Sequence, residues 1–134
     1  MLNCHVGTFT ADISPPLGHP LCGGGIEPVR GQDDPLEAVG IVLLGCGAPV
    51  VLCALDWCEI RNDAHLKWRH ALADAAHTTI ERVFVHAVHQ HNAPIADLEA
   101  EKIIKNKSHW IRAINNIANN TLSKFQGQSN SIIF

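Results

Sequence analysis

VGIVLLGCGAPVVLCAL, residues 39–55, is the stretch that decides the fold. Two runs rich in Val and Leu, residues 39–44 and 50–55, flank a segment at 45–49 that contains Gly and Pro. Apolar runs of this length bounded by turn residues predict two buried strands joined as a hairpin. The glycines and the proline interrupt the stretch, so it lacks the roughly 20 continuous apolar residues of a membrane-spanning helix. We therefore expect no transmembrane segment.

The segments on either side of the hairpin predict the rest of a sheet and a helix. Val6 to Ile13 alternates apolar and polar residues, which is typical of a strand, and a loop rich in Gly and Pro follows at 15–35. Asn62 is expected to cap a helix, and Val83 to Val88 forms another apolar strand that leads into His89. The buried face of that helix would carry Ala64, Trp68, Ala71, Leu72 and Ala75. We predict an α/β fold, with α+β as the alternative: a mixed β-sheet covered by two amphipathic helices.

The second helix is predicted after Pro94. The acidic residues Asp97, Glu99 and Glu101 suit the start of a helix. Helical spacing then relates Trp110, Ile111, Ile114, Ile117, Ala118, Leu122 and Phe125. Residues 131–134 have the composition of a strand that begins just before the chain stops. We therefore expect an incomplete domain that needs the remainder of the domain or a partner strand.

Composition bounds the class of protein and its surroundings. The chain has 134 residues, of which 46% are apolar, and a formal net charge of −3, as expected for one globular domain. Lys and Arg are scattered except around 102–107, which gives no footprint for nucleic acid. The five cysteines are an odd number without a Cys-x-x-Cys pair, so reduced thiols are expected. No secretion signal is visible, and a cytoplasmic location is favoured for this chain.

His89-Gln90-His91 is the one arrangement of histidines with a specific geometry. It follows an apolar strand, and residues i and i+2 of a strand point to the same side. Both imidazoles would then converge on one ion while Gln90 points away. A catalytic zinc usually takes three protein ligands and water, so two histidines do not complete a site. The alternative is a polar strand end whose histidines bind solvent or backbone.

Other polar residues have two interpretations each. Asp56 ends an apolar strand, where its carboxylate could orient a ligand histidine or act as a turn residue. His19 or Asp56 could supply a third ligand, whereas His86 falls on the opposite face of its strand. Glu59, Arg61 and Asp63 could face the site or form caps and surface salt bridges. The remaining histidines near the first helix, expected to be solvated, are His65, His70 and His77.

The order of these motifs resembles a known family. VGTFTADISP at 6–15, a Gly-rich loop, Asp56 after two strands and VHQHNAP at 88–94 are similar to the N-terminal portion of neutral/alkaline, non-lysosomal ceramidases. Members of that family carry a His-Thr-His-Ser-Gly-Pro motif. Gln90, Asn92 and Ala93 depart from it and leave the substrate open. By this resemblance, residues 1–134 are the N-terminal part of a ceramidase-like hydrolase domain, truncated at its C-terminal end.

The resemblance implies a zinc-dependent amidase that acts on a small-molecule or lipid amide such as an N-acylsphingosine. His89 would be the metal ligand, with zinc as the cofactor of the intact protein. His91 would be the catalytic residue that binds substrate or stabilises the transition state. Gly23 or Gly24 would line the entrance, and Asn92 and Asp56 would lie in the surrounding shell or substrate loop.

The chain lacks the family's remaining ligands, which are a further histidine, a glutamate and a tyrosine beyond its end. We therefore expect weak zinc binding and little amidase activity from this chain alone. Two alternatives remain. The chain is a non-catalytic binding or assembly module that keeps the fold, or a complete small metalloenzyme with His19 or Asp56 as third ligand.

Overall fold

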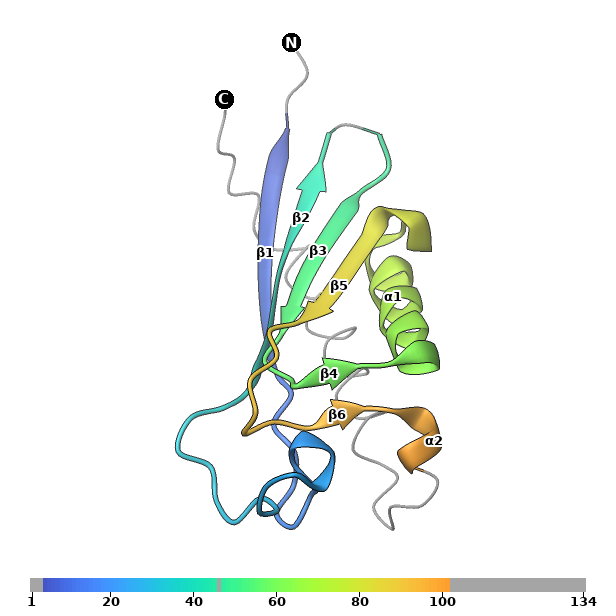
Figure 1. Ribbon diagram of the computed structural model, residues 1–134. Coiled ribbons are helices and arrows are strands. Elements are labelled where there is room, and N and C mark those ends of the chain that lie inside the picture. Colours follow the sequence, from blue (N-terminus) through green and yellow to red (C-terminus); the bar gives the residue numbers. More distant parts are fainter. Residues whose placement is uncertain (1–3, 46, 102–134) are drawn as a thin grey trace.

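A computed structural model describes residues 4–45 and 47–101 of the chain. A four-stranded sheet in the order β1-β2-β3-β5 forms its centre (Figure 1). The strands are β1 His5–Asp12, β2 Glu37–Leu44, β3 Val50–Leu55 and β5 Val83–Ala87. β1, β2 and β3 are antiparallel neighbours, whereas β5 runs parallel to β3. The predicted hairpin and the predicted mixed sheet are confirmed.

Helix α1, Asn62–Ala76, connects the two parallel strands and packs on one face of the sheet (Figure 1). Trp68 and Leu72 on this helix are fully buried, and the Trp68 ring meets Trp57 edge to face with 5.3 Å between centroids. Arg69 donates hydrogen bonds to the carbonyl oxygens of Ile80 and Val83. These contacts hold β5 beside β3. Two parallel strands cannot be joined by a tight turn, and α1 is the crossover connection between them.

The predicted cap of α1 is wrong. Arg61 occupies the capping position without a side-chain hydrogen bond, and Asn62 is the first residue of the helix with a φ of 42°. The chain enters α1 directly from the short strand β4, Glu59–Ile60, and the Arg61 N–H donates to the Ala96 carbonyl. Asn62 therefore makes the turn with its backbone, in a conformation that asparagine tolerates better than most residues.

A second, two-stranded sheet lies beyond the end of the main one (Figure 1). β4 pairs in parallel with β6, Ile95–Ala96, and the sequence did not predict either strand. Helix α2, Leu98–Glu101, follows, and the Asp97 carboxylate accepts hydrogen bonds from the N–H groups of Glu99 and Ala100. The acidic helix start is thus confirmed. The rest of the predicted second helix and the strand at 131–134 lie outside the described residues.

The sheet face opposite α1 is apolar and partly exposed. Val39, Leu52 and Phe84 are 45%, 38% and 59% exposed, and Leu52 is the register partner of Phe84. Alternation along the strands places these side chains opposite the buried ones that pack under α1. Across the described ranges, no helix has both the length and the apolar character to span a bilayer.

Candidate functional site

The segment that carries His89 leaves β5 and crosses the end of β3. The Val88 N–H donates to the Leu55 carbonyl and the His89 N–H to the Trp57 carbonyl. His89 itself has a φ of 63°, in the left-handed region, and lies outside the strand, which ends at Ala87. His89 and His91 therefore do not share one side of a strand, and that prediction is wrong. The two residues lie instead in an irregular segment between β5 and β6.

This irregular segment nevertheless brings the two imidazoles together. The Nε2 atoms of His89 and His91 are 3.4 Å apart, and the rings are nearly perpendicular with 5.0 Å between centroids. Two nitrogen ligands on one tetrahedral zinc, each about 2.0–2.1 Å from the ion, lie roughly 3.3 Å apart. The separation of the two Nε2 atoms fits that value.

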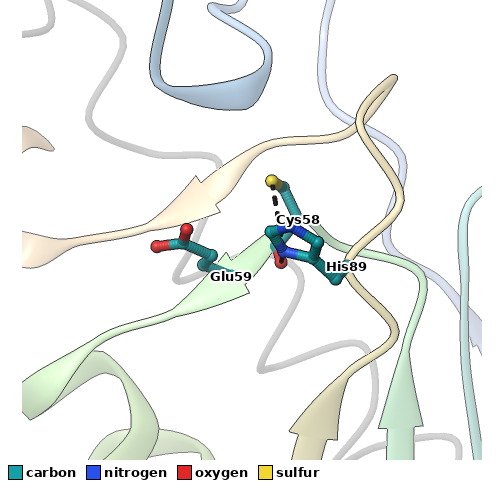
Figure 2. Close-up of side chains that lie close together, drawn as sticks. All are labelled: Cys58, Glu59 and His89. Carbon is teal, nitrogen blue, oxygen red and sulfur yellow. Dashed lines mark hydrogen bonds between the residues drawn. The ribbon is translucent and has the colours of Figure 1, made fainter.

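The second ring nitrogen of His89 is held by the backbone. Its Nδ1 lies 3.0 Å from the Cys58 carbonyl oxygen, and because a carbonyl only accepts, Nδ1 carries the proton in this contact (Figure 2). The neutral ring then has its lone pair on Nε2, the atom that faces His91. Hydrogen bonds of this kind orient a metal-binding histidine and set its tautomer.

A different set of side chains lies beside the same ring. Cys58, Glu59 and His89 each offer a ligand atom within 4.8 Å of the others, and within the described part of the chain this is the one such group of three (Figure 2). The Cys58 sulfur is 3.9 Å from Nδ1. Burial, followed by the hydrogen bond to Cys22, raises the pKa of the Cys58 thiol to about 11. The Glu59 carboxylate pairs with Arg61.

A metal ion would break different interactions at the two nitrogens of the His89 ring. Ligation through Nδ1 would break the hydrogen bond to the Cys58 carbonyl and would require an ion to displace the proton of a buried thiol. Ligation through Nε2 leaves that hydrogen bond intact. The geometry therefore favours the Nε2 edge.

Sequence reasoning missed Cys58. β3 and β5 are parallel neighbours, so the residues that follow them emerge at the same edge of the sheet, where ligands commonly bind. Cys58 lies three residues after β3 and His89 two residues after β5. That spacing was the available signal.

Asp56 also lies at this edge, where it ties two strands together. Its carboxylate accepts a hydrogen bond of 3.0 Å from the Glu37 N–H, and its own N–H donates to the Glu37 carbonyl. The Cys58 carbonyl, rather than this carboxylate, holds Nδ1 of His89. Asp56 thus supports the turn from which Trp57 and Cys58 extend.

A cavity of about 600 Å³ lies beside the histidine segment. Its lining includes Asp56, Gln90, Asn92 and much of the loop from Pro28 to Leu36. The volume falls within the range of pockets that bind small molecules. Gln90 thus lines the cavity, whereas the rings of His89 and His91 contact each other.

The glycine-rich loop is bonded to the segment that follows His91. The 3-10 turn η1, Cys22–Gly24, has left-handed glycines at Gly23 and Gly24, and the Cys22 N–H donates to the Ala93 carbonyl at 2.9 Å. A Cβ on Gly23 would lie 3.1 Å from Ile95, so this loop packs closely on the start of β6. Neither glycine lines the cavity described above.

The contact between His89 and His91 involves neither the other two histidines weighed for the site nor those expected to be solvated. His19 is buried, burial lowers its pKa, and it is not in the group formed by Cys58, Glu59 and His89. His86 is exposed on β5, and His70 and His77 are exposed as predicted. The prediction for His65 is wrong, because its side chain is half-buried and its Nε2 lies 3.2 Å from the Val85 carbonyl oxygen.

Comparison with known proteins supports the resemblance at the level of fold. No family model and no curated protein matches the sequence. Among solved structures, a ceramidase complexed with C2 superposes with a TM-score of 0.71 at 17% identity, over 96% of this chain and 22% of that one. Neutral ceramidase from Pseudomonas aeruginosa gives a TM-score of 0.61 at 15% identity, over 94% of this chain and 21% of that one. The chain thus has a ceramidase-like fold and spans about a fifth of the length of these two proteins.

Proposed function

We propose that this chain carries part of the active site of a zinc-dependent amide hydrolase, with Nε2 of His89 as a metal ligand. The observation that carries the proposal is the 3.4 Å approach of the His89 and His91 Nε2 atoms, with Nδ1 of His89 anchored on the Cys58 carbonyl. The ceramidase-like fold supports an N-acyl lipid amide as the substrate class.

Zinc, when bound, would polarise the amide carbonyl and lower the pKa of a water molecule so that it can attack. The contribution of this chain is positioning. The Cys58 carbonyl holds the His89 ring in one tautomer and leaves Nε2 as the acceptor. His91 lies close enough to contact the same ion or the oxygen of a substrate beside it, which suits a catalytic residue that stabilises the transition state.

The cavity lined by Asp56, Gln90 and Asn92 is our candidate for the substrate region. It combines apolar walls from Leu21, Val29 and Leu36 with polar groups from the histidine segment. An amide with an apolar chain needs both features, since the chain must be shielded from water and the amide must be oriented. We assign Asn92 to this substrate loop. Gly23 and Gly24 remain candidates for the entrance because their loop is bonded to Ala93.

We propose further that the metal site is completed by residues from outside this chain's described segments. A catalytic zinc takes three protein ligands, and His89 and His91 supply two nitrogens at most. Neither His19 nor Asp56 belongs to the group of close ligand atoms around His89 among residues 4–45 and 47–101. We therefore expect the chain alone to bind zinc weakly and to hydrolyse amides slowly.

Zinc titration of purified protein tests this proposal, with His89→Ala as the variant and His86→Ala as the matched control. His86 is exposed and lies on β5. It takes part neither in the contact of the His89 ring with His91 nor in the one with the Cys58 carbonyl, so its loss should leave zinc binding unchanged. We expect weak 1:1 binding that His89→Ala abolishes. Equal binding by the wild type and His89→Ala would overturn the ligand assignment, and nanomolar affinity of the wild type would overturn the incomplete site.

One observation favours a second function, a binding or assembly module. The apolar face that contains Val39, Leu52 and Phe84 would be shielded by another layer, either the remainder of a domain or a partner. Size-exclusion chromatography distinguishes the two functions. A discrete oligomer that Phe84→Ser disperses would support the module, whereas an unchanged monomer in both proteins would contradict it.

A further inference from the structure

Two cysteines meet beside the His89 segment and have no part in the proposed hydrolysis. The sulfur atoms of Cys22 and Cys58 are 3.8 Å apart, although the residues are separated by 36 positions in the sequence, and both are free thiols. We propose that Cys22 and Cys58 are a modification site that forms a reversible intramolecular disulfide. This proposal is independent of zinc and of amide hydrolysis.

The backbones of both cysteines are hydrogen-bonded to the same short segment, Ala93-Pro94. The Cys22 N–H donates to the Ala93 carbonyl at 2.9 Å, and the Cys58 N–H donates to the Pro94 carbonyl at 3.0 Å. Ala93 and Pro94 are adjacent and both buried. The two backbones therefore flank one dipeptide, which keeps the thiols close without a covalent link. Bond formation requires the sulfurs to approach from 3.8 Å to about 2.05 Å.

The two thiols differ in their access to solvent. Cys58 is 2% exposed, whereas Cys22 is partly exposed at the glycine-rich loop. A soluble oxidant such as glutathione disulfide therefore reaches Cys22 first. The Cys22 thiolate attacks one sulfur of glutathione disulfide, which forms a mixed disulfide and releases one glutathione thiolate.

The buried Cys58 thiol completes the thiol–disulfide exchange. Its sulfur attacks the Cys22 sulfur of the mixed disulfide, the bond from Cys22 to glutathione breaks, and the departing glutathione thiolate takes the Cys58 proton. In the net reaction the protein loses two hydrogen atoms and glutathione disulfide becomes two glutathione molecules. The new bond joins the η1 turn to the segment that presents the Cys58 carbonyl to His89.

Peptide mapping after oxidation tests the proposal. The chain is incubated with glutathione disulfide and a metal chelator, alkylated, and digested with a protease that cleaves before aspartate. The digestion places Cys22, Cys58 and Cys4 on three different peptides, 12–32, 56–62 and 1–11, while Cys46 and Cys53 share a fourth, 34–55. We expect a linked 12–32/56–62 product that dithiothreitol reverses. Absence of that product while the exposed Cys4 is modified would overturn the proposal.

Single variants test the order of the two steps. In Cys58→Ser, Cys22 should accumulate as the glutathione mixed disulfide, because the resolving thiol is gone. In Cys22→Ser, the buried Cys58 should stay unmodified under the same conditions. The opposite pattern, with glutathione on Cys58 and none on Cys22, would contradict the assignment of Cys22 as the entry point. Pairing with Cys4 in the folded wild type would contradict the site itself.

Discussion

The Nδ1 atom of His89 lies 3.0 Å from the backbone carbonyl oxygen of Cys58, a contact made between the segments that follow two parallel strands. The contact uses the main chain of Cys58 and not its thiol. Any side chain at position 58 that preserves the backbone therefore preserves the orientation of the histidine. Substitution of the Cys58 side chain therefore tests which nitrogen of the His89 ring binds the metal.

Cys58→Ser is expected to leave zinc affinity unchanged, because the carbonyl that orients His89 remains and Nε2 is the proposed ligand atom. Isothermal titration of the wild type and Cys58→Ser would measure this. A loss of binding in Cys58→Ser, together with a loss in Glu59→Gln, would instead place the metal among Cys58, Glu59 and His89.

Replacement by Phe is expected to lower the free energy of unfolding by different amounts at the two core tryptophans, Trp57 and Trp68. Both are fully buried, but Trp57 Nε1 donates to the Ile13 carbonyl at 3.1 Å, whereas Trp68 Nε1 has no hydrogen-bond partner within the described residues. Trp57→Phe leaves a buried carbonyl without its donor, which costs about 1–3 kcal/mol. Urea unfolding should show Trp57→Phe less stable than Trp68→Phe. Equal losses, or a larger loss in Trp68→Phe, would contradict the argument.

Gly40 permits the close packing of Phe9 across β1 and β2. The two residues are register partners, and a Cβ on Gly40 would clash with the Phe9 ring and approach the Leu52 carbonyl oxygen to 2.8 Å. Gly40→Ala is therefore expected to destabilise the fold by about 1–3 kcal/mol. Gly31→Ala is the matched control, since a Cβ there has nothing within 4 Å. Thermal unfolding of both variants measures the difference, and similar melting temperatures would refute it.

Stability should fall at alkaline pH because of a buried thiol. Cys53 is 2% exposed, and burial raises its pKa from 9.0 to about 12. The unfolded chain loses this proton at lower pH than the folded chain, so the stabilisation is complete below pH 9.0 and is lost as the pH rises towards 12. The slope is about 1.4 kcal/mol per pH unit for one group. Urea unfolding from pH 8 upwards should show a shallower decline for Cys53→Ala, and parallel declines would contradict the assignment.

The main sheet could be predicted because its elements have strong local patterns. The Val- and Leu-rich runs at 39–44 and 50–55 and the helical spacing of Ala64, Trp68 and Leu72 each reflect burial on one face. β4 and β6 have two residues each, too few for a periodic pattern. Their pairing depends on a parallel contact between distant segments, which local pattern does not specify.

The histidine pair was identified for a reason that the structure corrects. His89 and His91 do converge, but through the left-handed backbone of His89 in an irregular segment, not through strand alternation. A positive φ at a non-glycine residue is uncommon and leaves no compositional trace. The partner of Nδ1 is a backbone carbonyl, and the residue type at position 58 carries no information about it. For these reasons the orientation of the ring had to come from the fold.

The most direct test of the central claim is the tautomer of His89, measured by nitrogen-15 NMR of the labelled imidazoles before and after addition of zinc. We predict that Nδ1 of His89 is protonated in both states and that the Nε2 resonance shifts when zinc binds, while His86 stays unchanged. Protonation on Nε2, or a zinc-induced shift on Nδ1, would contradict it.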